Sequence, residues 1–515
     1  MADPYGYDEL PYPSAPYPYT HPDHLATLAT LFGLEIAAVE DSRVLEVGCA
    51  DGANLIPMAV TLPRGRFVGV DLSLRQVAAG RRLMDRLKLT NVELLHGDLR
   101  KFTADEPFDW IIAHGFYSWT PRETRSRLFD ICHRHLAPRG AAFVSYNVLP
   151  GWQPRLALRQ WLLQVIDQEP QTTERLRLAR RNLRHLSKVL GQASGDRQLQ
   201  QIRSEIERME QWSDAYLRHD LLEDFNEPVS FADFVAHARE HGLRFFAEAD
   251  LATMVGKGLP ADVAHRLPQL AGTQLLREQV IDILTNRTFR QSLLCHQERC
   301  PRDHIGPDAV RSLYAVSTLK QVSDGNATNS GPSTFAGRSG FRILVEDPVC
   351  CEALRGLERR WPAGEFVTAS VRSARDRLRD SGRPVREDEF ASAIDALAAI
   401  LLAGFADRCV ELHVTSRPFE TEPNERPEAS RLARVQAEYQ GWVSSLRHDL
   451  VHLSDKQRLL VRHLDGTCCR ADLAERLAGS PQFAELEPVD EVIDSSWIET
   501  QLGWLARRGI LCPAR

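Results

Sequence analysis

The peptide VLEVGCADGAN, residues 44–54, decides the fold of this chain. Its first half is an apolar run that predicts a short strand, and its second half predicts a turn followed by a helix. Gly48 and Gly52 allow the backbone to approach a ligand closely, where a Cβ atom would block it. The helix that follows points its free N–H groups and its positive dipole end at that ligand. The peptide therefore predicts a binding turn between a strand and a helix.

Two features separate this turn from the dinucleotide-binding fingerprint. The third glycine and the spacing that faces a pyrophosphate are missing. Glu46, at the end of the strand, is unusual beside a pyrophosphate but suits a cationic ligand such as an amino-acid ammonium. We therefore expect the ligand to carry a positive charge near this carboxylate.

Outward from the turn, short apolar runs alternate with helical segments. The runs predict seven strands, at 43–47, 66–70, 92–95, 109–113, 141–146, 243–248 and 288–295. Helices are predicted between the first five, at 54–61, 74–87 and 122–135. Such alternation is typical of a parallel sheet that is covered on both faces, so the fold class is α/β and Rossmann-like. Residues 151–225 read as helices only and predict a helical insertion before the sixth strand.

Polar residues follow the next predicted strands at the same edge of the sheet. Asp71 ends the second strand, where a carboxylate accepts both hydroxyls of a ribose. Asp98 follows the third strand, where an acid accepts an adenine amino group. Residues 114–119, HGFYSW, follow the fourth strand, where substrate meets cofactor.

The glycine turn, Glu46, Asp71, Asp98 and the aromatic string, in that order and spacing, resemble the class I S-adenosylmethionine-dependent methyltransferases. Longer peptides at 7–33, 114–121, 145–152 and 229–243 narrow the resemblance. They are similar to bacterial methyltransferases that carry a methyltransferase regulatory domain, such as the rickettsial protein-lysine methyltransferases of outer-membrane proteins. The resemblance covers most of residues 7–300 and is weaker in residues 301–515.

This resemblance implies a seven-stranded class I core with added domains. We expect an N-terminal arm and first helix of a cofactor lid at 1–40, and the core at 41–300 with its helical insertion at about 152–226. We expect a small middle domain at 301–420 and a mostly helical, winged-helix-like C-terminal domain at 431–515, with a wing beginning at 509–511. Residues 323–340 and 416–430 are predicted linkers because Gly, Ser, Asn or Pro dominate them.

The resemblance also implies the site residues. The cofactor S-adenosylmethionine is expected to contact the following set: Glu46, Gly48, Cys49, Gly52, Asn54, Asp71, Leu72, Asp98, Leu99, His114 and Tyr19. The catalytic candidates are His114, Tyr117 and Trp119. No metal is expected.

Several roles stay open at this point. Methyl transfer is an in-line displacement in which the protein aligns the nucleophile and excludes water. His114 either accepts the proton of a substrate lysine or hydrogen-bonds the backbone, and the Tyr117 hydroxyl is a candidate to orient the amine. Trp119 either faces the sulfonium, which aromatic rings favour, or packs in the core. Asp220 and its neighbours 223–224 either hold a basic side chain or cap helices.

Composition limits the partners and the location. The chain has 515 residues, 43% of them hydrophobic and 26% charged, which excludes general disorder. Its net charge of −7 disfavours a nucleic-acid substrate. The richest apolar run, 396–405, is shorter than the ~20 residues of a membrane span. The ten cysteines show no disulfide or zinc spacing, and the expected location is the cytoplasm.

Three functions are compatible with these sequence features. The first is methyl transfer to lysine side chains of a protein, for example an envelope protein. The second is N- or O-methylation of a small molecule. The third is a regulatory protein that binds the cofactor without turnover. The oligomeric state is not predicted.

Overall fold

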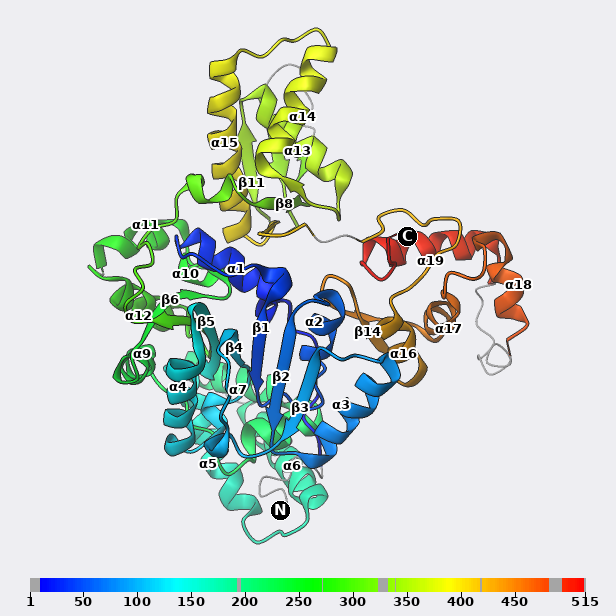
Figure 1. Ribbon diagram of the computed structural model, residues 1–515. Helices are drawn as coiled ribbons and strands as arrows, with labels where there is room; N and C mark the ends of the chain where they lie inside the picture. The colour runs from blue at the N-terminus through cyan, green and yellow to red at the C-terminus, as the bar shows by residue number, and fades with distance from the viewer. Residues whose placement is uncertain are drawn as a thin grey trace.

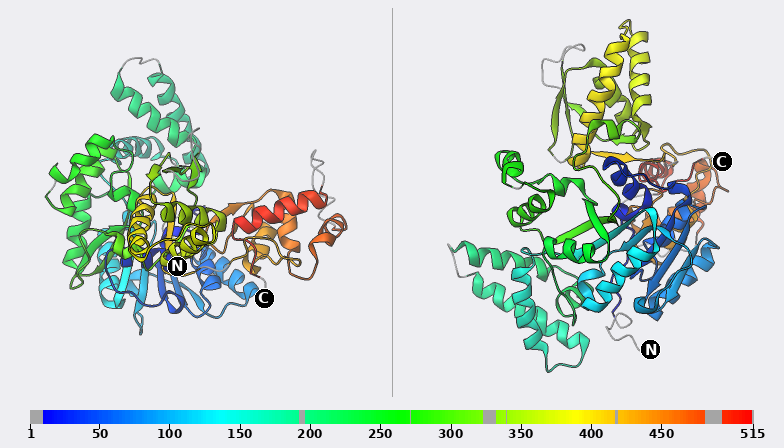
Figure 2. Two further views of the ribbon diagram at one scale, coloured as in Figure 1. Left: turned by 90° about the horizontal axis from the view of Figure 1, so that it is seen from above. Right: turned by 60° about the vertical axis from the view of Figure 1, so that its left-hand side comes forward.

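A computed structural model describes residues 10–191, 196–270, 272–322, 332–338, 340–416, 419–480 and 493–513. A central α/β core carries a middle domain above one end of its sheet and a C-terminal domain beside it (Figure 1). A long helical insertion projects from the core on a further side (Figure 2).

The core is a seven-stranded sheet in the order β3-β2-β1-β4-β5-β7-β6. Its strands are β1 (Arg43–Val47), β2 (Arg66–Asp71), β3 (Val92–His96), β4 (Phe108–Ala113), β5 (Leu136–Asn147), β6 (Leu243–Glu248) and β7 (Phe289–His296). The predicted class I fold is confirmed, but the sheet is not purely parallel. Strand β7 inserts between β5 and β6 and runs antiparallel to both. The order reverses at β1 and β4, so the carboxyl ends of these two strands form the crevice where α/β sheets bind ligands.

Helices cover both faces of this sheet. They are α1 (Pro22–Leu31), α2 (Leu55–Thr61), α3 (Leu74–Leu87), α4 (Arg122–His135), α9 (Phe231–Glu240), α10 (Leu251–Met254), α11 (Ala261–Leu270) and α12 (Gln274–Thr285). Short 3-10 turns lie at η1 (Pro18–Thr20), η2 (Val39–Asp41), η3 (Leu99–Lys101), η4 (Tyr117–Trp119) and η6 (Pro307–Val310). Ser73 and Ser230 begin α3 and α9 by accepting a backbone N–H, which satisfies donors that a helix start leaves free.

The helical insertion consists of α5 (Gln153–Ile166), α6 (Thr172–Leu190), α7 (Arg197–Glu210) and α8 (Asp214–Tyr216), followed by a π-helical turn, η5 (Leu217–Leu221). Leu176, Ala179 and Leu183 of α6 are buried and pack in a separate small core. A π-helical turn is rare and frequently lies at a functional site.

The middle domain joins two three-stranded sheets with three helices. Its elements are β8 (Tyr314–Ser317), β9 (Lys320–Val322), β10 (Ser333–Ala336), β11 (Arg342–Val345), α13 (Pro348–Arg360), β12 (Glu365–Phe366), α14 (Val367–Asp380), α15 (Glu387–Ala406) and β13 (Val410–His413). The predicted linker at 323–340 is wrong in part, because β10 lies within it; residues 323–331 and 339 fall outside the described ranges. Within those ranges, α15 alone is long and apolar enough for a membrane span, yet it buries a face that includes Leu397 and Leu401 in this domain.

The C-terminal domain contains α16 (Arg431–Tyr439), β14 (Trp442–Ser444), β15 (Leu450–His452), α17 (Asp455–His463), η7 (Arg470–Asp472), α18 (Leu473–Ala478) and α19 (Ser495–Arg507). Its hairpin is β14–β15. The wing predicted at 509–511 is wrong, because Leu511 forms only a single bridge with Ala429. Helix α16 packs Leu432 and Val435 against α2 and α3, which fixes the domain beside the core.

A buried ion cluster fixes α12 to the sheet. Arg290 of β7 is fully buried and donates to Glu248 at 2.7 Å, Asp282 at 2.8 Å and Glu278 at 3.1 Å. Its guanidinium also lies 3.9 Å from the ring centre of Phe231. Burial lowers and the carboxylates raise the pKa of Arg290, and the carboxylates prevail. We call these four charged residues the Arg290 cluster.

Candidate cofactor and acceptor site

The glycine turn has the backbone that its sequence requires. Gly48 and Gly52 have φ angles of +71° and +75°, and Ala50 between them has +51°. A Cβ on Gly48 would lie 3.1 Å from the ring of Phe116, which closes the turn from the β4 side. The backbone N–H of Ala50 donates to Asp71 at 2.8 Å and so ties the turn to the end of β2. The turn is therefore held between the end of β2 and the ring of Phe116.

Glu46 is buried at the base of this turn with one oxygen unsatisfied. Its Oε1 accepts 2.7 Å from the Asn54 amide, while Oε2 has no hydrogen-bond partner within the described part of the chain. Burial raises the pKa of Glu46 to about 8, against the hydrogen bond from Asn54, and Asp71 and Asp51 raise it further. A buried acceptor without a donor is costly, so this geometry suits a ligand that brings an ammonium. The amino-acid end of S-adenosylmethionine carries such a group, and the site fits it.

Asn54 connects Glu46 to the N-terminal arm. Its Oδ1 accepts 2.9 Å from the backbone N–H of Tyr17 and 3.2 Å from the Thr20 hydroxyl, and its Nδ2 donates to Thr20 and Glu46. The same Oδ1 lies 2.9 Å from Nε2 of His448 in the C-terminal domain. Asn54 thus contacts three parts of the chain that are distant in sequence.

The two acids that the sequence predicts for ribose and adenine, Asp71 and Asp98, are less enclosed than Glu46. Asp71 is half-buried and accepts from Ala50 and, at 2.8 Å, from the Ser73 N–H. A carboxylate accepts several hydrogen bonds, so the prediction that Asp71 accepts ribose hydroxyls is compatible with this geometry. Leu72 beside it is 41% exposed, as a side chain under a ligand would be.

Asp98 and Leu99 differ from each other in orientation. Asp98 begins η3 and pairs with Arg100 at 2.6 Å, which lowers the pKa of its carboxyl. A Cβ on the preceding Gly97 would meet no atom within 4 Å, so there is room beside this acid. Leu99 is 5% exposed and packs in the core, where it shapes the wall from behind.

Cys49 contributes its backbone only. Its side chain is 4% exposed and fills the space beside Gly69, where a Cβ would lie 2.6 Å from Sγ. Burial raises the pKa of the Cys49 thiol well above its usual range. The thiol is therefore neutral and unsuited to chemistry.

His114 lies at the end of β4 under two tyrosines from the arm. The Tyr17 ring stacks on it with centres 4.0 Å apart, and the Tyr19 hydroxyl lies 2.9 Å from its Nε2. Burial lowers the pKa of His114 to about 4. An imidazole with that pKa is neutral and too weak a base to hold a proton taken from an amine. We therefore assign it a packing and hydrogen-bonding position.

Tyr117 lies in the core beside α9, and Trp119 contacts the π-helical turn of the insertion. The Tyr117 ring is 2% exposed among the core aromatics, and its hydroxyl lies 2.8 Å from Nδ1 of His237. The Trp119 indole donates 3.2 Å to the carbonyl of His219 and so joins η4 to the insertion. The Tyr117 hydroxyl faces His237, which does not fit the expectation that it orients an amine, whereas the structure leaves both alternatives for Trp119 in place. A string of aromatics after a strand does not by itself reveal which side chains turn inward.

The site also contains residues outside the predicted set, together with Asp220, whose role the sequence left open. Tyr12, Tyr17 and Tyr216 approach the same end of β4, and Asp220 lies beside Tyr12 on the π-helical turn. His448 gave no signal in the sequence, because no glycine or motif marks its hairpin. Only the tyrosine-rich arm was visible as an unusual composition.

Comparisons with known proteins agree with this geometry. Three family models match: a methyltransferase domain at residues 44–140, a predicted methyltransferase regulatory domain at 213–296, and the C-terminal winged helix domain named PKMT at 425–494. An uncharacterized protein of Rickettsia prowazekii is 30% identical over 497 residues, which cover 94% of this chain and 88% of the relative. The structure of PKMT2 from Rickettsia typhi is similar with a TM-score of 0.84 at 24% identity, over 98% of this chain and all of that one. PKMT2 has also been solved in complex with AdoHcy.

Proposed function

Because the chain belongs to the family of S-adenosylmethionine-dependent methyltransferases with a regulatory domain and a C-terminal winged-helix domain, we propose that it methylates lysine side chains of a protein. Methyl transfer from this cofactor is the activity of the family. The lysine acceptor is our proposal, supported by the shared fold with PKMT2 and by the residues at the end of β4.

The observation that carries the lysine acceptor is a group of phenol rings with an acid behind them. Tyr12, Tyr17, Tyr19 and Tyr216 form what we call the tyrosine cluster. Tyr12 meets Tyr216 edge to face at 5.1 Å, and Tyr17 lies 5.7 Å from Tyr19. Aromatic faces favour a cationic side chain, and phenol oxygens accept its hydrogen bonds. The cluster surrounds the end of β4, where the acceptor meets the methyl group.

Asp220 supplies a carboxylate next to the tyrosine cluster. Its Oδ1 is buried and has no hydrogen-bond partner within the ranges that the structure describes. Burial raises the pKa of Asp220 to about 7, although Arg155 acts in the opposite direction. Like Glu46, it is a buried acid that forms no ion pair among the residues described, and Arg155 acts on it without contact. We infer that the cation is the lysine ammonium of the acceptor.

Each group at this site then has its own part in methyl transfer. The bound cofactor supplies an electrophilic methyl group. The tyrosine cluster removes water from the amine, which lowers the pKa of lysine by disfavouring its charged form. Asp220, with a pKa close to neutral, is a better acceptor for the ammonium proton than His114 with a pKa of about 4. Tyr19 and His114 hold each other in place, which keeps the approach to the methyl group aligned.

The test is to incubate the purified protein with methyl-labelled S-adenosylmethionine and an envelope-protein extract, hydrolyse the labelled protein and identify the modified amino acid. We expect methyl-lysine, and we expect Asp220→Asn to lower its formation at least tenfold while cofactor binding is retained. The matched control is Asp224→Asn, an exposed acid of the same segment. Label in small molecules only would contradict the lysine proposal and favour the second function. Cofactor binding with no label in any fraction would favour a regulatory protein without turnover.

We also propose a cytoplasmic location. All ten cysteines are free thiols, which fits a reducing compartment. Cell fractionation with an antibody to the chain tests this, and recovery in the membrane fraction would contradict it.

A further inference from the structure

The hairpin of the C-terminal domain reaches into the core. Residues 445–449, which we call the hairpin loop, connect β14 to β15. The Ser445 hydroxyl accepts the N–H groups of Arg447 and Asp449, and the Leu446 N–H donates to the Gly509 carbonyl at 2.7 Å. His448 has a φ of +66° and is completely buried. A histidine in this left-handed conformation is uncommon, and the surrounding structure holds it there.

The imidazole of His448 reaches Asn54, the last residue of the peptide 44–54. Its Nε2 lies 2.9 Å from Oδ1 of Asn54. An amide oxygen only accepts, so Nε2 carries the proton and donates. His448 also packs beside His21, with ring centres 5.2 Å apart, at the start of α1. The C-terminal domain therefore contacts the core at two places, Asn54 before α2 and His21 before α1.

The bond from His448 bears on the orientation of the Asn54 amide. Oxygen and nitrogen of an amide are similar in size, so hydrogen-bond partners decide which way it faces. Two N–H donors meet at Oδ1, from the Tyr17 backbone and His448, and they direct Nδ2 toward Glu46. Once the ligand ammonium has ionised Glu46, a reversed amide would turn its oxygen toward the carboxylate and repel it.

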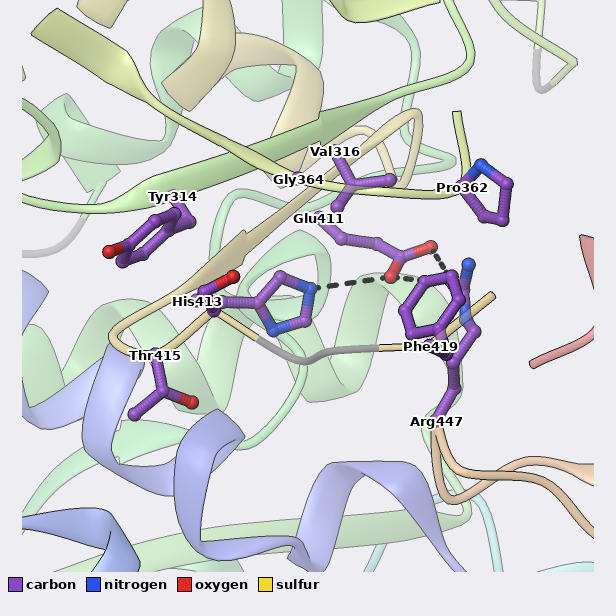
Figure 3. A pocket seen from close by; sticks show the side chains of 10 residues that line it. Tyr314, Val316, Pro362, Gly364, Glu411, His413, Thr415, Phe419 and Arg447 are labelled. Carbon is purple, nitrogen blue, oxygen red and sulfur yellow. Dashed lines mark hydrogen bonds and ion pairs between the residues drawn. The ribbon is translucent and has the colours of Figure 1, made fainter. Parts of the chain in front are cut away.

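The neighbouring residue of the same loop makes a different contact. Arg447 donates to both oxygens of Glu411 in β13, at 2.6 and 2.8 Å. Glu411 also faces His413, whose Nδ1 lies 2.6 Å from the buried Asp23 of α1. Figure 3 shows Glu411 between His413 and Arg447, in a pocket also lined by Tyr314 and Phe419. Arg447 thus joins the loop to the middle domain and His448 joins it to the core.

We propose that His448 is a positioning residue for the cofactor: the C-terminal domain completes the site for its amino-acid end by directing the Asn54 amide toward Glu46. The proposal rests on cofactor binding, the first part of the proposed function, and is independent of the lysine acceptor. It assigns the C-terminal domain a part in the site at a distance of almost four hundred residues in sequence.

The test measures binding of S-adenosylhomocysteine by calorimetry to four forms of the full chain. We expect His448→Ala to weaken binding about tenfold, the effect of one lost hydrogen bond at the site. His448→Gln places an amide N–H at the same reach and should restore binding to within about threefold of the wild type. Arg447→Gln is the matched control, because it loosens the same loop without touching Asn54, and its affinity should stay within about threefold.

Thermal unfolding of each variant separates positioning from stability. A merely structural His448 would make the affinities follow the melting temperatures, so Arg447→Gln and His448→Ala would lose affinity together, and that result would overturn the proposal. Unchanged affinity in His448→Ala would also overturn it. If His448→Ala does not fold, the affinities of His448→Gln and His448→Leu are compared instead. Only Gln donates a hydrogen bond, so the proposal predicts weaker binding in His448→Leu. A wild-type chain that binds no S-adenosylhomocysteine would instead contradict the proposed function itself.

Discussion

The core buries carboxylates in two places, around Arg290 and at Glu46, and gives them opposite surroundings. In the Arg290 cluster, three acids share one fully buried guanidinium, and Arg287 lies 3.3 Å from one of them. At Glu46, one oxygen accepts from Asn54 and the other has no partner in the described residues. Both places lie within one domain and at similar depth.

This difference separates acids that hold the fold from acids that wait for a ligand. A buried charge with its counter-ion resists unfolding, because removing either partner leaves the other uncompensated. A buried acid without a counter-ion destabilises the ligand-free protein and is retained for what it binds. Asp220 belongs to the second kind and Glu278 to the first.

The largest expected effect is on the Arg290 cluster. Arg290→Met leaves Glu248 without its ion-pair partner and leaves Glu278 and Asp282 with Arg287 alone, at 3.7 and 3.3 Å, so we expect a loss of about 3–5 kcal/mol in the stability of the core. Thermal and urea unfolding measure it, and Glu46→Gln is the control that should unfold at or above the wild-type midpoint. An Arg290→Met protein as stable as the wild type would show that the cluster does not hold the fold.

A second prediction separates the two acids of the binding crevice. Asp71→Asn should weaken binding of adenosine and of S-adenosylhomocysteine alike, by about 1.5–3 kcal/mol, because both carry the ribose. Glu46→Gln should leave adenosine binding unchanged, because adenosine lacks the amino-acid end. Calorimetry with the two ligands measures both effects. Equal loss of adenosine affinity in both variants would contradict the assigned positions.

The third prediction concerns pH. The pKa of Glu46 is raised from 4.5 to about 8, so the folded ligand-free protein keeps a proton that the unfolded chain loses. The stability from this group is present below pH 4.5 and is lost as the pH rises toward 8. Binding an ammonium favours the ionised acid, so cofactor binding at pH 7 should release about 0.9 of a proton. Calorimetry in buffers of different ionisation enthalpy measures the release, which should vanish in Glu46→Gln.

The smallest expected effect is at the arm. Tyr19→Phe removes the hydroxyl that meets His114, so we expect a loss of about 0.5–1.5 kcal/mol in stability and a modest fall in the rate of methyl transfer. Tyr439→Phe, an exposed tyrosine of the C-terminal domain, is the control. A Tyr19→Phe protein with no change in either quantity would show that this hydrogen bond does not position His114.

Much of the core was predictable from the sequence because strand periodicity, glycine turns and polar strand ends are local signals. Glu46 and Asn54 lie where the peptide 44–54 predicts them. The antiparallel β7 was not predictable, since an apolar run carries no direction. The strand β10 was hidden in a segment rich in Ser and Gly that reads as a linker.

The roles of aromatic side chains were less predictable than their positions. Tyr117 and His114 are three residues apart, yet one enters the core and the other the crevice, because Gly115, with a φ of +64°, turns the chain between them. The contact of His448 depends on how two domains dock, which no local pattern encodes. Long-range contacts of this kind appear only in the folded chain.

The most direct test of the central claim compares two buried glutamates. Binding of S-adenosylhomocysteine is measured by calorimetry for the wild type, for Glu46→Gln and for Glu278→Gln. We predict one site in the wild type, affinity at least tenfold weaker in Glu46→Gln, and unchanged affinity in Glu278→Gln with lower thermal stability. Unchanged affinity in Glu46→Gln, or an equal loss in both variants, would contradict the claim that the unpartnered acid marks the cofactor site.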